Sequence, residues 1–258
     1  MKKFISSVLV LTMILALLVG CRSAQVEGPS VPAADPTTVL TTEPTQNTTE
    51  EVEDEIEAST HYIQNVYPQQ IARYYNAISQ QWDEMTYLDN DMSTLVAHYY
   101  NGKALDNVGF NFMDLDGDGI WELIIGAIMN AEKNPLVFEI WKLQDGQPVM
   151  IAQSGSHNRY YLQYAQADDK WTVAYEAENG AANYAAYSLE LVNGEFKVIQ
   201  GVVFDARADE ENPWFMTSDL DWDVSNDTPI DEATANAAME AYRNIYAPTE
   251  YIPYSLYK

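Results

Sequence analysis

The sequence predicts an α+β fold in which an antiparallel meander of about seven strands follows two helices and precedes a third helix. Three observations predict this class: apolar residues recur with a helical period soon after residue 60, alternate beyond residue 107, and return to a helical period after residue 228. Hydrophobic residues make up 47% of the chain, enough to build a packed core, and all 18 tyrosines lie beyond residue 60. We therefore expect residues 61–258 to form a single globular domain.

Two helices are predicted at the start of this domain. Pro68 is well placed for the first turn of the first helix, because a proline there gives up no hydrogen bond. Its apolar face is formed by Ile71, Tyr74, Tyr75, Ile78, Trp82 and Met85. Asp91 can cap the second helix, and Asn101-Gly102 would end it. The face of that helix is formed by Met92, Leu95, Val96 and Tyr99.

The meander is predicted by alternating runs that turn dipeptides separate over residues 108–204. Asp145-Gly146 and Asn193-Gly194 are strong hairpin signals, because both residues of such a turn adopt positive φ, and Asn179-Gly180 is a weaker signal. The tract Ile120–Met129 is almost entirely apolar, so we expect a central strand with helices packed on it.

The last helix is expected to start at Thr228-Pro229 and to end before Pro248. Small and apolar residues then share one line along the predicted helix, at Ala233, Ala237, Ala241 and Ile245.

Charge and cysteine content exclude two classes of protein. The chain has 13 Lys and Arg residues against 39 Asp and Glu residues, and the resulting net charge of −26 excludes electrostatic binding of nucleic acid. Its single cysteine, Cys21, cannot form an internal disulfide, so stability must come from the core or from a metal ion. No internal repeat of roughly 20 to 50 residues is present, so neither a propeller nor a solenoid is expected.

Residues 1–20 have the pattern of a secretory signal peptide, with two lysines before an apolar run from Val8 to Val19. The alternative is an uncleaved membrane helix, but the run is short for a span of about 20 residues. Leu18-Val19-Gly20-Cys21 resembles the lipobox of bacterial lipoproteins. The resemblance implies cleavage before Cys21, lipidation of its thiol, and anchoring to the extracytoplasmic face of the cell membrane by two or more acyl chains.

Residues 21–60 carry the lipidated cysteine and a tract rich in Thr, Pro and Glu that cannot bury enough surface to fold. Nine acidic residues and one basic residue between Arg22 and Thr60 should keep this tract extended. We expect a disordered tether that holds the domain away from the membrane. A disordered tail without a spacing role predicts the same sequence.

One segment has a specific metal-binding pattern, with four carboxylates at relative positions 1, 3, 5 and 9 of Asp114–Glu122. These anions repel one another unless a cation lies among them. Calcium takes about six to eight oxygen ligands, which short Asp side chains at alternate positions supply, and Gly119 permits the sharp bend. We predict a Ca²⁺ site with the ligands Asp114, Asp116, Asp118, the carbonyl oxygen of Ile120, and Glu122. The alternative is a solvated acidic turn without a metal.

The same segment differs from a full EF-hand, because Ile125 stands where the bidentate glutamate belongs. It enters the apolar strand Leu123–Gly126 and resembles the calcium-binding hairpin loops of FG-GAP and related VCBS repeats. Those loops usually have Asp at the position of Glu122. With its lipobox, acidic tether and single loop, the chain is similar to surface lipoproteins of Gram-positive bacteria. The resemblance implies calcium binding outside the cell, where an affinity of about 10⁻⁴ to 10⁻³ M suffices.

A second acidic run repeats this spacing at Asp219, Asp221, Asp223 and Asp227. Val224 stands where the bend requires a glycine, so the sequence favours a half-buried strand whose Asp side chains face solvent. Whether these residues form a second ion site stays open at this point.

No catalytic signature accompanies these features. The chain has no Gly-x-Ser-x-Gly elbow, no His-Glu-x-x-His zinc motif and no phosphate-binding glycine loop. Glu176 and Glu178, two apart on a strand, lie near the lower limit for a glycosidase pair, but such pairs arise readily in so acidic a chain. Ser156–Arg159 precedes an aromatic strand, and either a pocket wall or a hairpin loop explains it.

The sequence thus supports three functions. The first is a calcium-stabilised ligand-binding or adhesion domain whose exposed Tyr and Trp residues stack on glycans or peptides. The second is an extracytoplasmic polysaccharide hydrolase that uses a carboxylate pair, and the third is a structural envelope protein without a small ligand. Because no catalytic motif is present, the sequence favours a non-enzymatic function. An aromatic cleft would support the first, two facing buried carboxylates the second, and a surface without a cleft the third.

Overall fold

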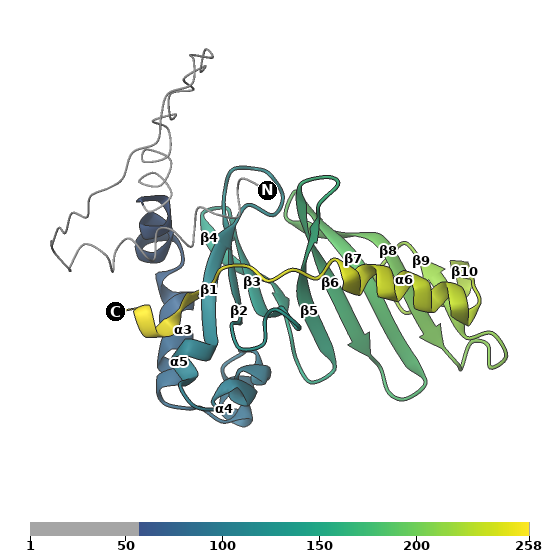
Figure 1. Ribbon diagram of the computed structural model, residues 1–258, viewed down its shortest axis with the longest axis horizontal. Helices are drawn as coiled ribbons and strands as arrows, with labels where there is room; N and C mark the ends of the chain where they lie inside the picture. Colours follow the sequence, from purple (N-terminus) through teal and green to yellow (C-terminus); the bar gives the residue numbers. More distant parts are fainter. Residues whose placement is uncertain (1–56, 258) are drawn as a thin grey trace, which may run out of the picture. The chain divides into compact units, whose positions relative to one another are not determined.

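The computed structural model describes residues 57–257, and the chain forms one compact unit from His61 onward (Figure 1). The predicted signal peptide, the lipidation site Cys21 and most of the predicted tether lie outside the described residues. Within the described residues, no helix has both the length and the apolar character needed to cross a membrane.

The α+β class is confirmed, and the antiparallel sheet is larger than predicted. Its 11 strands lie in the order β10-β9-β8-β7-β6-β5-β3-β2-β1-β11, with β4 paired to β3. Their bounds are β1 Val108–Met113, β2 Glu122–Ala127, β3 Leu136–Gln144, β4 Gln147–Gln153, β5 Asn158–Ala165, β6 Lys170–Glu178, β7 Asn183–Val192, β8 Glu195–Asp205, β9 Trp214–Thr217, β10 Thr228–Pro229 and β11 Ile252–Pro253. The expectation of about seven strands was wrong partly because β10 and β11 have two residues each, too few for a visible alternation.

Strands β4 and β5 pair with the same edge of β3. Between them the buried Ser154 donates its hydroxyl to the Val137 carbonyl at 2.5 Å and accepts from the Tyr160 N–H at 2.9 Å. These bonds hold the interruption of the ladder close to β3. The interruption itself, residues 154–157, supplies a loop at the start of β5.

The N-terminal part of the unit contains more and shorter helices than the predicted two. They are the π-helix η1 (Tyr62–Val66), α3 (Pro68–Ser79), α4 (Glu84–Asp89), the 3₁₀-helix η2 (Thr94–Tyr99) and α5 (Ala104–Asn107). Pro68 begins α3 as predicted, but the helix does not reach Trp82 or Met85, because Gln81 adopts a left-handed φ of +51°. A new helix then starts after Asp83, whose side chain accepts from the Thr86 N–H at 2.8 Å.

The helix predicted to start at Asp91 was also misplaced. Asp91 has a φ of +51°, whereas a capping residue has an extended backbone. The chain instead forms η2 after Ser93. Met92, Leu95 and Val96 are buried as predicted, since a short 3₁₀-helix also gathers such closely spaced side chains on one side.

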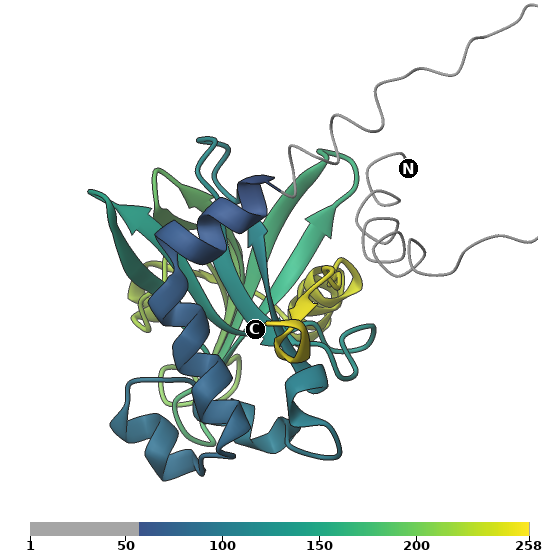
Figure 2. The same cartoon turned by 90° about the vertical axis from the view of Figure 1, so that its left-hand side faces the viewer.

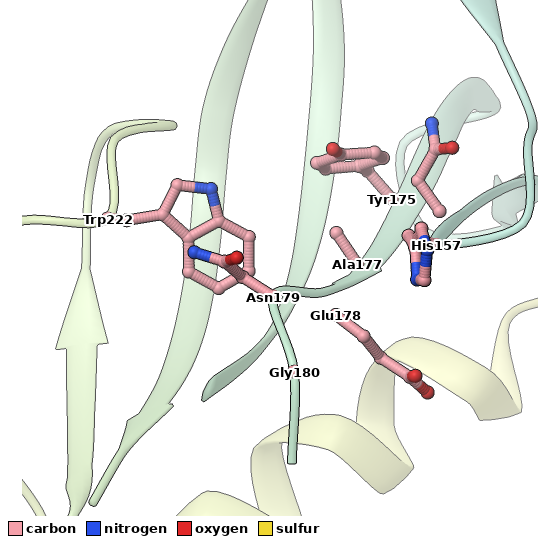
Figure 3. Close-up of a pocket in the computed structure, with 8 residues that line it drawn as sticks. His157, Tyr175, Ala177, Glu178, Asn179, Gly180 and Trp222 are labelled. Atoms are coloured by element: carbon pink, nitrogen blue, oxygen red, sulfur yellow. The ribbon is translucent and has the colours of Figure 1, made fainter. Parts of the chain in front are cut away.

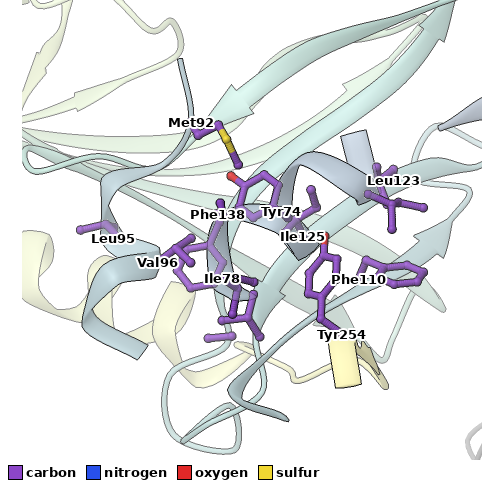
Figure 4. Packing of buried hydrophobic residues seen from close by; sticks show 14 of the residues in the cluster. Tyr74, Ile78, Met92, Leu95, Val96, Phe110, Leu123, Ile125, Phe138 and Tyr254 are labelled. Atoms are coloured by element: carbon purple, nitrogen blue, oxygen red, sulfur yellow. The ribbon is translucent and has the colours of Figure 1, made fainter. Parts of the chain in front are cut away.

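These helices cover one face of β1, β2 and β3 (Figure 2). The largest core cluster lies between them, and Figure 4 shows Tyr74 and Ile78 of α3 facing Phe110, Ile125 and Phe138 of the sheet. Every residue of β2 is buried, which confirms the predicted central strand with helices packed on it.

A carboxylate, Glu139, is fully buried within this helical side of the core. Its Oε1 accepts from the Ser93 N–H at 3.2 Å, and its Oε2 accepts from the Trp141 indole N–H at 2.8 Å. Burial raises the pKa of Glu139 above its ordinary value. Its hydrogen bonds join the segment before η2 to β3.

The opposite face of the sheet curves around a second cluster. Ile124 of β2 and Val173 of β6 share it with Leu191, which lies near the end of β7, and with Leu115 of the β1–β2 connection. Strands β3, β5 and β6 separate β2 from β7, so strong sheet curvature is needed to bring these residues together. The curvature places the turn between β7 and β8 beside the β1–β2 connection.

Helix α6 (Glu232–Asn244) packs on β7, β8 and β9 at the other end of the sheet (Figure 1). It starts later than predicted, because Asp231 caps it by accepting from the Thr234 N–H at 2.7 Å, while Thr228-Pro229 form β10. The later start also changes the buried face. That face consists of Ala235, Met239 and Tyr242 instead of the predicted Ala233, Ala237, Ala241 and Ile245.

The chain after α6 returns to the N-terminal helices. The Ala247 N–H donates to the Leu162 carbonyl of β5 at 3.0 Å, and β11 then pairs with β1. In the following 3₁₀-helix η4 (Tyr254–Leu256), Tyr254 is fully buried in the first core cluster. The segment after α6 therefore connects the two ends of the sheet.

Candidate metal centre and aromatic cleft

The β1–β2 connection brings three carboxylates together. One oxygen each from Asp114, Asp116 and Glu122 lies within 4.8 Å of the other two. Oxygens that bind one Ca²⁺ ion at roughly 2.3 to 2.6 Å are at most about 5 Å apart, so this spacing fits a shared calcium ion. Within residues 57–257, no other group of three acidic, histidine or cysteine side chains converges in this way.

The backbone of the connection is folded around Asp114. Its Oδ1 accepts from the Gly117 N–H at 2.8 Å, and its Oδ2 accepts from the Gly119 N–H at 3.0 Å. Gly117 and Gly119 have φ values of +75° and +84°, which strain residues with a Cβ atom. The bend predicted at Gly119 is therefore present.

Glu122, the first residue of β2, is the buried member of the group, with 2% of its surface exposed. Its Oε2 accepts from the Leu115 N–H at 2.8 Å, and no Lys, Arg or His side chain pairs with it in the described residues. Burial, together with the charges of Asp116, Asp118 and Asp114, raises the pKa of Glu122 to about 7, although the Leu115 hydrogen bond lowers it. A cation would remove this penalty.

One of the four predicted carboxylate ligands, Asp118, does not join the group. Asp118 turns its Oδ1 to the Ile120 N–H at 2.7 Å, and its carboxylate is not among the converging oxygens. The Ile120 carbonyl oxygen stays a predicted ligand. Three carboxylates leave coordination positions on Ca²⁺ that backbone carbonyls or water would have to supply, and this donor set of hard oxygens suits calcium.

Two segments hold the β1–β2 connection in place, namely η1 with the adjoining Tyr67 and the β7–β8 hairpin. The sequence predicted neither contact. The Trp121 N–H donates to the Tyr62 hydroxyl at 3.0 Å, the Tyr67 hydroxyl donates to the Trp121 carbonyl at 3.1 Å, and the Tyr62 and Trp121 rings stack with centroids 5.4 Å apart. On the other side, the Gly194 N–H donates to Oδ2 of Asp116 at 3.1 Å. The candidate metal centre thus links η1 to the β7–β8 hairpin.

The second acidic run was wrongly expected to be a strand. Residues 218–222 form bends, and the 3₁₀-helix η3 (Val224–Asn226) follows after its cap Asp223. The Asp221 N–H donates to Asp219 at 3.3 Å, and the Asp223 N–H donates to Asp221 at 2.8 Å. Asp side chains favour such local bonds to the backbone over the hydrogen-bond ladder of a strand. The carboxylates of Asp219, Asp221, Asp223 and Asp227 do not converge.

A cleft of about 590 Å³ opens where this run passes the end of β6 (Figure 3). Trp222 and Tyr175 project into it from different segments, with Ala177 between them. The remaining lining residues are His157, Asn158, Glu178, Asn179 and Gly180. His157 and Asn158 belong to Ser156–Arg159, the segment for which the sequence allowed either a pocket wall or a hairpin loop.

The carboxylate pair considered for a glycosidase does not face a shared space. Glu176 accepts from Arg243 at 2.8 Å and from the Tyr246 hydroxyl at 3.0 Å on the side covered by α6. Glu178 points toward α6, away from Trp222 and Tyr175 (Figure 3). Glu176 and Glu178 therefore do not form a pair of carboxyl groups that faces a substrate.

The comparisons with known proteins add no relative. No protein-family model, no curated protein and no solved structure matches the chain. The function must therefore be argued from the sites themselves.

Proposed function

We propose that the chain is a lipid-anchored extracytoplasmic protein whose globular domain binds Ca²⁺ and presents a ligand-binding or adhesion surface. The anchor rests on the sequence of residues 1–21, which resembles a signal peptide with a lipobox at Cys21. The globular domain has no catalytic role in this proposal.

One observation carries the calcium part of the proposal. Oxygens of Asp114, Asp116 and Glu122 converge within 4.8 Å, and no basic side chain of the described residues pairs with the buried Glu122. Burying a carboxylate without a compensating charge costs free energy. A divalent ion supplies that charge and also relieves the repulsion among the three acids.

The cleft beside Trp222 supports the ligand-binding part over the two alternatives. A structural envelope protein without a ligand needs no such cleft. The hydrolase alternative needs two carboxyl groups that face a substrate, and Glu176 is engaged by Arg243 instead. No observation therefore favours either alternative.

Calorimetric titration with CaCl₂ and thermal unfolding of the full-length chain in detergent test the calcium site. Calcium at roughly ten to a hundred times its dissociation constant should stabilise the native state by about 1.4 to 2.7 kcal/mol. For a domain of this size, such a gain raises Tm by roughly 3 to 11 °C over the chelator-treated protein. Identical melting curves with EDTA and with calcium would refute the site.

Matched variants separate ion binding from general acidity. Asp116→Asn and Glu122→Gln should abolish most of the calcium-dependent rise in Tm. Asp221→Asn is the control, because Asp221 occupies the same relative position in the second acidic run but does not converge with other carboxylates. An equal loss in all three variants would indicate nonspecific electrostatics.

The anchor is tested separately by fractionation of cells that express the chain. The wild-type chain should partition with membranes, and mass spectrometry should find acyl chains on Cys21. Cys21→Ser should release the protein from the membrane fraction. Retention of that variant in membranes would argue for an uncleaved helix instead of a lipid anchor.

A further inference from the structure

The cleft beside Trp222 has two separate aromatic walls. Tyr175 is fixed within a row of tyrosines on neighbouring strands, with its ring centroid 4.7 Å from Tyr160 and 5.8 Å from Tyr187. Trp222 stands on the other side, packed against the same face of the sheet (Figure 3). In the described part of the chain, the Trp222 indole stacks on no other ring. The two walls therefore leave apolar surface open to a ligand.

The loop that carries Trp222 is held in place before any ligand arrives. The consecutive bonds from the N–H groups of Asp221 and Asp223 to the preceding Asp side chains fix its bends. The Tyr187 hydroxyl also donates to the Asp221 carbonyl at 3.5 Å. Such a preformed wall loses little conformational freedom when it binds a ligand.

Uncharged polar groups surround the aromatic walls. In residues 57–257, no hydrogen bond engages the Tyr175 hydroxyl, the Trp222 indole N–H, the side-chain amide of Asn179 or the His157 ring. These groups supply hydrogen-bond donors and acceptors at several places along one cleft. They are the kind of convergent polar groups that orient a ligand in an otherwise apolar site.

The charge around the cleft disfavours anionic ligands. No Lys or Arg lines it, and carboxylates of the second acidic run flank Trp222. Arg159 is paired across the strands with Glu176, on the opposite face of the sheet, and its side chain donates to the carbonyls of Gly155 and Asn158. Anionic ligands would be repelled. Aromatic faces attract cations, but Glu178, the one carboxylate among the lining residues, points away from Trp222 and Tyr175 and so adds no charge partner there (Figure 3).

A peptide strand has no place to pair here. β6, which supplies Tyr175 and Ala177, lies between β5 and β7, and both of its edges are paired along the cleft. Peptides that add a strand to a sheet need a free edge. A sugar ring needs none, since it offers apolar C–H faces to aromatic rings and hydroxyl groups to amides and phenols.

We propose that this cleft binds a neutral saccharide, with sugar rings against Tyr175 and Trp222 and hydroxyl groups hydrogen-bonded to Asn179 and His157. The inference deepens the proposed ligand-binding function and rests on it. It does not require the calcium site. The cleft volume of about 590 Å³ lies within the range of roughly 300 to 1,000 Å³ that is usual for small-ligand sites.

The test is calorimetric titration of the full-length chain in detergent with four neutral hexasaccharides, namely those of β-glucose, α-glucose, β-mannose and β-N-acetylglucosamine. Hexagalacturonate serves as the anionic probe and an uncharged hexapeptide as the peptide probe. At least one neutral hexasaccharide should bind at millimolar concentration, and the anionic and peptide probes should bind at least about tenfold more weakly.

Variants place the binding in the cleft. Trp222→Ala should weaken saccharide binding at least about tenfold. Asn179→Ala should weaken it too, and this exposed side chain makes no hydrogen bond within residues 57–257, so the variant should fold even if Trp222→Ala does not. Trp82→Ala is the control, because that indole packs against Tyr87 in the α3–α4 region and bonds to Gln80.

Three results would overturn the proposal: no binding of any neutral hexasaccharide, equal binding in Trp222→Ala, Asn179→Ala and the wild-type chain, or preferential binding of the anionic or peptide probe. Each titration is repeated with calcium and with EDTA. Saccharide binding without any calcium-dependent rise in Tm would reject the calcium site alone. A normal rise without saccharide binding would reject the cleft alone.

Discussion

The backbone N–H of Gly194 donates to Oδ2 of Asp116 at 3.1 Å and thereby joins two turns that are 78 residues apart in the sequence. Gly194 belongs to the β7–β8 hairpin, and Asp116 belongs to the candidate metal centre. A carboxylate oxygen has two lone pairs, so it can accept this hydrogen bond and still bind an ion. We therefore expect ion binding at the candidate metal centre to affect the mobility of the β7–β8 hairpin.

Removal of the Asp116 carboxylate should loosen that hairpin. In Asp116→Ala the Gly194 amide loses its acceptor and should exchange with solvent faster than in the wild-type chain, as measured by amide hydrogen exchange. Gly146 is the internal control, because it lies in the corresponding Asp-Gly turn of the β3–β4 hairpin, with a nearly identical φ of +75°. Faster exchange at both glycines would point to general destabilisation of the fold.

The stabilisation by calcium should depend on pH through Glu122. The pKa of this residue is about 7 in the metal-free protein and 4.5 ordinarily, so between these values the native state holds a proton that the unfolded state has released. The stability of the metal-free protein should therefore fall as pH rises through this window. Calcium needs the ionised carboxylate, so its effect on Tm should be larger at about pH 8 than at about pH 5.

Thermal unfolding with EDTA and with calcium across this pH range measures both trends. Glu122→Gln should remove the fall in stability of the metal-free protein, since an amide does not titrate. Glu178→Gln, which changes an exposed glutamate away from the metal centre, should leave both trends unchanged. A calcium effect that does not vary with pH would mean that Glu122 is not a ligand.

The ligand set read from the sequence and the set that the structure brings together predict different behaviour for Asp118. In the structure its Oδ1 is bonded to the Ile120 N–H, and it does not join the other three carboxylates. Asp118→Asn should therefore reduce calcium affinity, measured by calorimetry, less than Asp114→Asn does. An equal or greater loss for Asp118→Asn would mean that the loop rearranges around the ion to use the ligands expected from the spacing alone.

The features that could be predicted from the sequence are those set by local chemistry. Asp145-Gly146 and Asn193-Gly194 form hairpin turns because few other residue pairs accept positive φ twice in succession. The burial of β2 followed from its continuous apolar run. The end of α3 was not predicted, because Gln81 adopts the left-handed φ that ends the helix, and a glycine usually marks that position in a sequence.

The rest depends on contacts between distant segments. The cleft takes His157 from the loop before β5, Tyr175 from β6, Asn179 from the β6–β7 loop and Trp222 from the second acidic run. No local pattern records that sheet curvature and loop packing bring these four side chains together. The bond from Gly194 to Asp116 is of the same kind, because two independent turns meet only when the sheet curves.

Two glycines with positive φ, one in the candidate metal centre and one outside it, allow backbone strain to be separated from ion binding. Gly119 has a φ of +84° and Gly180 in the β6–β7 loop has a φ of +87°, and nothing lies within 4 Å of a Cβ atom added at either position. Alanine at each should therefore cost only the left-handed backbone penalty, about 1 to 2 kcal/mol, in urea unfolding with EDTA. With calcium present the two variants should diverge. Gly119→Ala distorts the bend that aligns Asp114 with the other acids, so it should lose calcium affinity as well as stability, whereas Gly180→Ala should bind calcium as the wild-type chain does. Equal calcium affinities in both variants would mean that the bend at Gly119 is not needed for calcium binding.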